Sequence, residues 1–128
     1  MLKIEGKNIQ ITRGDMLSLT ISATNDIDGS DYSFQTTDVI RFKVFEKANV
    51  ENVLLEKDFN VSEEATELII TMTSEEMKIG ELIDSSKDYW YEIELNPDTE
   101  RTQTIVGYDM EEGAAILTLM PEGGDTKW

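Results

Sequence analysis

Residues 89–95 read Tyr-Trp-Tyr-Glu-Ile-Glu-Leu and alternate large apolar side chains with mostly charged ones. A period of two is typical of a β-strand that buries one face. We expect the two tyrosines, Ile93 and Leu95 to face a core. Trp90 then lies on the opposite face, beside the two glutamates.

The same alternation recurs on both sides of this stretch. The other predicted strands cover residues 8–12, 16–24, 39–46, 52–59, 66–72, 102–109 and 114–120. Together with residues 89–95 they make eight short strands at fairly even spacing. This pattern predicts an all-β fold, an antiparallel sandwich or barrel.

One segment breaks the period of two. Residues 73–76, Thr-Ser-Glu-Glu, have the spacing of a capping box, in which a threonine and a glutamate close the start of a helix. Ile79, Leu82 and Ile83 follow at helical spacing. We therefore expect one short helix over about residues 74–83, which Gly80 either ends or weakens.

The chain has 128 residues, about the size of one domain, and no cysteine. Leu, Ile, Val and Phe make up about a quarter of it, which is enough for one hydrophobic core without disulfides. No repeat or linker divides the sequence. We expect a single β-sandwich domain over residues 1–121 and a flexible C-terminal tail over residues 122–128.

Charge narrows the classes of function. With 27 acidic and 11 basic residues, the net charge is −16, which repels nucleic acid and anionic membranes. The chain has no histidine, which is the commonest general base and metal ligand, and no cysteine, which supplies the thiol nucleophile. No apolar run is long enough to cross a membrane, and the start lacks the pattern of a signal peptide. We therefore expect a protein made in the cytoplasm, with protein partners, no cofactor, no metal site and no enzymatic activity.

Arg13, Gly14 and Asp15 match the tripeptide that animal adhesion proteins present to integrins. A turn explains the same residues, because glycine adopts positive φ easily and aspartate can bond within its own turn. We interpret the tripeptide as a structural turn in a hairpin between the strands 8–12 and 16–24. On this interpretation Arg13→Ala leaves stability almost unchanged, whereas Gly14→Ala lowers it.

Two sets of acidic residues could carry chemistry. Residues 25–31 are rich in aspartate but lack the glycine and glutamate spacing of a calcium loop, so we interpret them as an acidic turn. The pairs Glu92/Glu94 and Glu111/Glu112 could supply the two carboxylates of a glycosidase. With so many acids in the chain, solvated surface charge is the simpler interpretation.

The aromatic residues suggest a binding surface. Tyr89-Trp90-Tyr91 with Tyr108 could form a stacking platform, but alternation places both tyrosines of residues 89–91 in the core. Trp90 and Phe45 are expected on faces opposite the core residues of their strands. Large aromatics outside a core are typical of interfaces, so these two are the candidate interface residues.

Several short motifs resemble a known family. They are Ile-Gln-Ile-Thr-Arg-Gly-Asp at 9–15, Asp-Gly-Ser-Asp-Tyr at 28–32 and Asp-Val-Ile-Arg-Phe-Lys-Val at 38–44, with 107–109 and 119–123 near the end. They resemble the N-terminal domain of the baseplate upper proteins of tailed phages and prophages of Gram-positive bacteria. The resemblance implies an immunoglobulin-like antiparallel β-sandwich. It also implies a structural protein of the virion that associates with itself or docks to other phage tail proteins.

An alternative function stays open at this point. A β-sandwich of this size could be a carbohydrate- or protein-binding module that uses Trp90 or Trp128, with nearby tyrosines, to stack on sugar rings or to anchor a partner.

Overall fold

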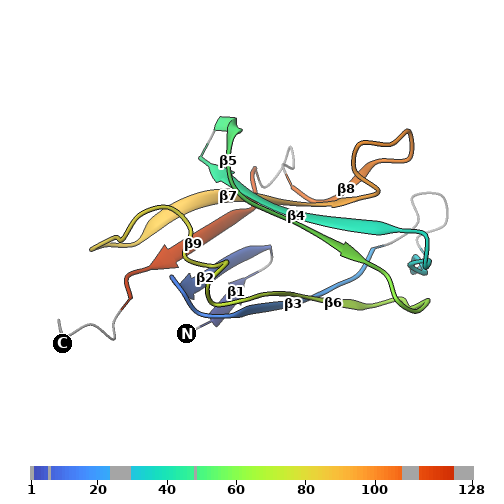
Figure 1. The fold of residues 1–128 in the computed structure, drawn as a ribbon, viewed down its shortest axis with the longest axis horizontal. Helices are drawn as coiled ribbons and strands as arrows, with labels where there is room; N and C mark the ends of the chain where they lie inside the picture. Colours follow the sequence, from blue (N-terminus) through green and yellow to red (C-terminus); the bar gives the residue numbers. More distant parts are fainter. Residues whose placement is uncertain (1, 6, 24–29, 48, 108–112, 123–128) are drawn as a thin grey trace.

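The computed structural model describes residues 2–5, 7–23, 30–47, 49–107 and 113–122, which form an all-β fold (Figure 1). The strands are β1 (Leu2–Glu5), β2 (Asn8–Thr12), β3 (Leu17–Ile21), β4 (Val39–Glu46), β5 (Asn49–Asn60), β6 (Leu68–Met72), β7 (Lys87–Leu95), β8 (Gln103–Val106) and β9 (Ile116–Met120). All eight predicted strands are present, and β1 is an additional one. Within the described ranges, no helix has the length and apolar character needed to span a membrane.

The strands form two sheets. The larger sheet has the order β1-β2-β9-β7-β4-β5, with β8 beside β7, and the smaller sheet pairs β3 with β6. Every pair of strands is antiparallel except β2 and β9, which run parallel. The expectation of a wholly antiparallel arrangement is therefore wrong at this pair. The two strands lie near opposite ends of the sequence, so no tight turn constrains their relative direction.

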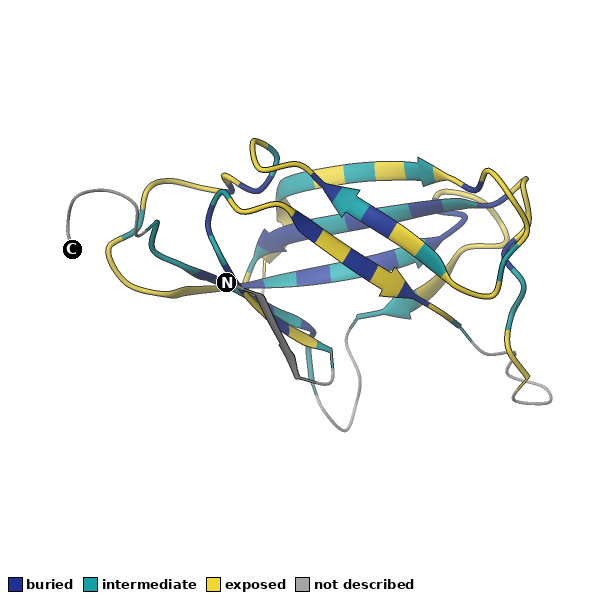
Figure 2. Cartoon of the chain, turned by 90° about the horizontal axis from the view of Figure 1, so that it is seen from below, coloured by how far each residue is buried: buried dark blue, intermediate teal, exposed yellow. Residues whose placement is uncertain are grey.

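The two sheets share one hydrophobic core. Buried side chains of β3 and β6 from the smaller sheet join those of β2, β4, β7 and β9 from the larger one. Buried and exposed residues alternate along β3 (Figure 2). The predicted core faces of residues 39–46 and 89–95 are confirmed, and Phe42 packs on Tyr91 between β4 and β7 with ring centroids 5.7 Å apart.

The turn at Arg13, Gly14 and Asp15 is confirmed, but the hairpin is wrong. Gly14 has φ of +89°, and Asp15 N donates to Thr12 O at 3.0 Å. However, β2 belongs to the larger sheet and β3 to the smaller one. The turn therefore carries the chain from one sheet to the other.

Arg13 is buried, so the expectation that it matters little is wrong. Its Nε donates to Ile79 O at 2.9 Å, and its Nη2 donates to Lys78 O at 3.2 Å and to Gly80 O at 2.8 Å. Its Nη1 pairs with Glu122 Oε1 at 2.5 Å. Glu122, the first residue of the expected tail, thus contacts a buried arginine. Residues 123–128 lie outside the described residues.

The expected helix over residues 74–83 does not form. The capping box itself is present, because Thr73 N donates to Glu76 Oε1 at 2.8 Å and Glu76 N donates to Thr73 Oγ1 at 3.2 Å. One turn follows, closed by Met77 N to Thr73 O at 3.0 Å. Beyond it, Gly14 N donates to Met77 O at 3.2 Å, the Arg13 side chain donates to the carbonyls of residues 78–80, and Gly80 has φ of +66°. The segment is therefore a single turn between β6 and β7.

A buried carboxylate joins the segment before β4 to the turn after β7. Asp38 accepts hydrogen bonds from Tyr32 Oη at 2.6 Å, Gln35 N at 2.9 Å and Asn96 Nδ2 at 3.0 Å. Asn96 Oδ1 in turn accepts from Val39 N at 3.0 Å. This cluster fixes the start of β4 against the end of β7.

These contacts also shift the titration of two groups. Burial raises the pKa of Asp38, but the hydrogen bonds that it accepts outweigh this effect and hold the pKa below its ordinary value. Burial and the neighbouring Asp38 carboxylate raise the pKa of Tyr32 to about 12.

Candidate protein interface

The outer face of the larger sheet, opposite the core, carries an apolar row across four strands. Val53 of β5 lies opposite Phe45 of β4, Phe45 opposite Trp90 of β7, and Trp90 opposite Ile116 of β9. Directly opposed residues of antiparallel strands point to the same face and contact one another. We call Val53, Phe45, Trp90 and Ile116 the apolar row.

The structure places the two candidate interface residues together in this row, but it exposes them differently. Phe45 is only 3% exposed, so the expectation of an exposed anchor is wrong for this residue. It lies on an interior strand between Val53 and Trp90, where the β4–β5 pairing is irregular, and these neighbours limit its contact with solvent. Trp90 is partly exposed and Val53 is 40% exposed. Ile116 is also partly exposed, so the accessible part of the row is Trp90, Val53 and Ile116.

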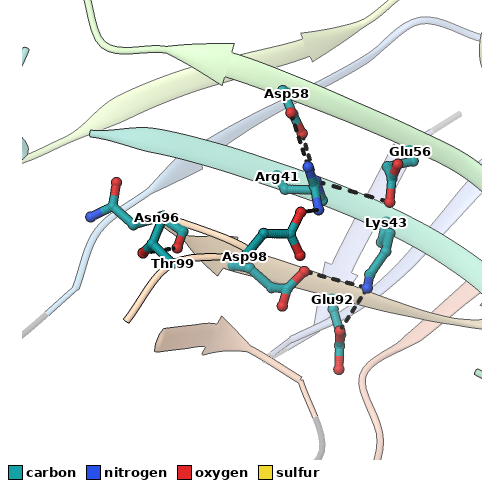
Figure 3. A network of polar contacts seen from close by, with 9 residues as sticks. Arg41, Lys43, Glu56, Asp58, Glu92, Asn96, Asp98 and Thr99 are labelled. Atoms are coloured by element: carbon teal, nitrogen blue, oxygen red, sulfur yellow. Dashed lines mark hydrogen bonds and ion pairs between the residues drawn. The ribbon is translucent and has the colours of Figure 1, made fainter. Parts of the chain in front are cut away.

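Ion pairs lie on the same face as the apolar row, because Arg41 and Lys43 alternate in step with Phe45 along β4. Figure 3 shows these ion pairs. Arg41 of β4 binds Asp58 of β5 through Nε at 2.7 Å and Asp98, in the turn after β7, through Nη1 at 2.9 Å. The third acid near Arg41 is Glu56, with an oxygen 3.9 Å from Nε. These contacts connect three segments of the outer face.

Lys43 forms the second centre of this network. Its Nζ lies 3.8 Å from Glu92 and 3.4 Å from Glu94, both on β7. Figure 3 shows Lys43 next to Arg41, with carboxylates on both sides. Five carboxylates thus surround two cations, so the face around the apolar row is acidic.

The network alters the ionisation of its acids. Hydrogen bonds from Arg41 hold the pKa of Asp58 below its ordinary value. Partial burial raises the pKa of Glu92, opposed by the charge of Lys43 and assisted by that of Glu94. Within the described part of the chain, buried Glu94 Oε1 accepts no hydrogen bond, but Lys43 Nζ lies 3.4 Å away. Glu92 and Glu94 therefore serve as ion-pair partners on this face.

Of the other candidates that the structure describes, Glu92 and Glu94 lie on this face and the two tyrosines of residues 89–91 do not. Tyr89 and Tyr91 are buried, as alternation predicted, so only Trp90 of residues 89–91 contributes to the outer surface. Tyr108, Trp128, Glu111 and Glu112 lie outside the described residues. The same holds for most of the acidic segment 25–31, of which residues 25–29 are not described.

Sequence reasoning missed the charged network. Arg41 and Lys43 alternate with core residues of β4, and Glu92 and Glu94 do the same in β7. Alternation thus assigns all four to outer faces. Only the register, which puts Lys43 opposite Glu92 and Arg41 opposite Glu94, brings them together.

Comparison with known proteins found no family model, no curated protein and no solved structure that matches this chain. The candidate interface is therefore interpreted from its own residues and geometry.

Proposed function

We propose that this protein is a structural component of a phage or prophage tail or baseplate, and that it works by docking to other tail proteins and to itself. The motifs at 9–15, 28–32 and 38–44 support the proposal, because they resemble baseplate upper proteins. The residues of two of these motifs build the fold: Arg13 holds the segment after β6, and Asp38 joins β4 to the end of β7.

The proposal includes an immunoglobulin-like fold. The order of strands supports it. In variable-type immunoglobulin domains one sheet contains strands G, F, C and C′ side by side, and the other contains B and E. Here β9-β7-β4-β5 have the former order and β3-β6 correspond to the latter pair. Phe42 occupies the central position of strand C and packs on Tyr91 of strand F.

The single observation that carries the docking function is the apolar row within an acidic face. A partly exposed tryptophan supported by a buried phenylalanine resembles the anchor of a protein interface. The surrounding carboxylates outnumber the cations, so the fitting partner is a protein with an apolar centre and a basic rim. Another tail protein of that kind is the expected occupant of this face.

The first test is the presence of the protein in the particle. Phage particles are purified from an induced culture of the bacterium that carries the gene, and their proteins are quantified by mass spectrometry. We expect the protein in fixed proportion to the tail proteins. Its absence from particles, when the induced cells contain it, contradicts the proposal.

The second test addresses the face. Trp90→Ala removes the accessible anchor, and we expect the variant to fold but to be depleted from particles by about tenfold or more, since truncating an interface anchor costs about 2 kcal/mol or more. Ile69→Ala is the matched control, because Ile69 is 72% exposed on β6, in the other sheet. Equal incorporation of both variants would show that the apolar row is not the docking site.

A further inference from the structure

Edge strands present unpaired N–H and C=O groups, which can pair with another chain unless charges, bulges or neighbouring side chains protect them. In the larger sheet, β1 has four residues, and β5 combines two register shifts with several charged side chains. The charged residues of β5 are Glu51, Glu56, Lys57 and Asp58. The third edge is β8, which pairs with β7, has four residues and carries a register shift. The edges of the larger sheet are thus short or protected.

In the smaller sheet, β6 is also protected. Lys57 of β5 donates from Nζ to Thr71 O of β6 at 3.0 Å and pairs with Glu76 at 2.8 Å. Glu67 precedes β6 directly and Glu75 follows it closely. An ammonium group therefore lies against the backbone of β6, and acids flank the strand.

The other strand of the smaller sheet, β3, has none of these protections. Its sequence is Leu-Ser-Leu-Thr-Ile, with no charge and no proline, and its register with β6 is continuous over all five residues. Among the residues that the structure describes, β3 pairs with β6 alone. It is therefore the edge most open to another strand.

The sequence of β3 is complementary to itself. An antiparallel copy centred on Leu19 places Ser18 opposite Thr20 of the copy and Leu17 opposite Ile21 of the copy. Apolar side chains then meet on the core side and hydroxyl groups meet on the outer side, which matches their burial in one chain. Such pairing about a two-fold axis is the geometry of a symmetric dimer.

We propose that β3 pairs antiparallel with β3 of a second copy, so that the sheet continues as β6-β3-β3-β6 through a two-fold axis at Leu19. The inference rests on the self-association included in the proposed function and assigns a surface to it. Charge favours this edge, because each chain carries −16 and an uncharged strand lets two copies meet without opposing carboxylates. The dimer is expected to tighten with salt, which screens the repulsion between the remaining charges.

The test changes the charge at the paired positions. In Ser18→Lys/Thr20→Lys, both substitutions bring an ammonium group opposite an ammonium group of the other copy. In Ser18→Lys/Thr20→Glu, the same pairing brings opposite charges together. Ser18 and Thr20 are exposed, and circular dichroism checks that the variants remain folded.

Dimer dissociation constants are measured by sedimentation at low and high sodium chloride. We expect the double-lysine variant to dimerise about tenfold or more weakly than the unmodified protein, because like charges directly opposed destabilise a strand pair. The Lys/Glu variant is expected to regain at least the original affinity. Double lysine also makes each chain less acidic, so weaker association cannot come from general repulsion.

Ile69→Lys is the matched control, since it adds a cation to the same sheet on β6. We expect it to leave the dimer intact. A protein that stays monomeric at high concentration and high salt overturns the inference, as does an Ile69→Lys variant that loses the dimer. Equal weakening in the two double variants overturns the register about Leu19.

Failure of this inference and failure of the proposed function give different results. A monomer that is nevertheless present in purified particles removes the β3 pairing and leaves the tail function. A dimer that responds to the double-lysine change, but is absent from particles, supports the pairing and removes the tail function.

Discussion

Arg13 shows how the fold can give a residue of a short turn a role at a distant segment. Its guanidinium bonds to the carbonyls of Lys78, Ile79 and Gly80 and to Glu122. A planar group with several fixed donors suits this task, because each carbonyl approaches from a different direction. Gly14, its neighbour, contributes a backbone conformation at positive φ and an N–H that donates to Met77 O at 3.2 Å, and a Cβ there would make ordinary contacts with Lys78.

Substitutions of Arg13 and Gly14 are therefore expected to lower the stability of the protein by different amounts. Arg13→Ala is expected to lower the free energy of unfolding by about 3 kcal/mol, because it removes charged hydrogen bonds and leaves the carbonyl of buried Ile79 without this donor. Gly14→Ala is expected to cost about 1 kcal/mol from strain at positive φ. Urea denaturation measures both changes, with Arg101→Ala, on an exposed turn, as a control expected within about 0.5 kcal/mol of the original. An Arg13→Ala midpoint equal to that of the control would contradict the supporting role.

At the scale of elements, the sequence predicts what depends on near neighbours. Alternation identifies eight strands and the buried faces of β4 and β7, because a period of two needs no knowledge of the partner strand. The capping box at residues 73–76 is likewise local and forms.

Features that depend on distant contacts were not predictable. The helix stops after one turn, and the carbonyls of residues 77–80 accept hydrogen bonds from Gly14 N and the Arg13 side chain, which are far away in the sequence. Phe45 is buried because its neighbours on β5 and β7 flank it, and the register that places them there cannot be read from alternation alone. The ion pairs of Arg41 and Lys43 depend on the same register.

The cluster that joins β4 to the end of β7 predicts how stability depends on pH. The pKa of Tyr32 is raised from 10.0 to about 12 in the folded protein. A group whose pKa is raised by folding stabilises the folded protein fully at pH values below its pKa in the unfolded chain. For Tyr32 this stabilisation is lost as pH rises from about 10 through about 12. Tyr32→Phe is expected to flatten this alkaline decline.

The carboxylate of the same cluster acts on the acid side. Folding lowers the pKa of Asp38, so its carboxylate stabilises the folded protein at pH values above the pKa of this group in the unfolded chain. This stabilisation is lost as pH falls through the pKa of Asp38 in the folded protein. Asp38→Asn is expected to weaken the protein at neutral pH and to reduce the loss between neutral and acid pH. Urea midpoints across pH measure both variants. A Tyr32→Phe profile that declines like the original above pH 10 would contradict the assignment.

At the scale of the whole molecule, salt has two opposing effects on stability. It weakens favourable ion pairs such as Arg13–Glu122 and Arg41–Asp58, and it weakens the repulsion among the excess carboxylates of a chain with charge −16. The favourable pairs involve arginines that are largely shielded from solvent, with side chains 9% and 17% exposed. Screening is strongest between exposed charges, so the repulsion is reduced more than the attraction.

Sodium chloride is therefore expected to raise the melting temperature by a few degrees, with most of the change complete once the screening length falls to about 8 Å near 0.15 M. Dimer formation would also raise it, but that contribution grows with protein concentration, whereas screening within one chain does not. Scanning calorimetry at several protein concentrations, on the original protein and on Ser18→Lys/Thr20→Lys, separates the two contributions. The double-lysine variant is expected to keep the rise that does not depend on concentration and to lose the rise that does. A melting temperature that falls with salt in both proteins would contradict this expectation. It would mean that the attraction within the ion pairs affects stability more than the repulsion among the carboxylates does.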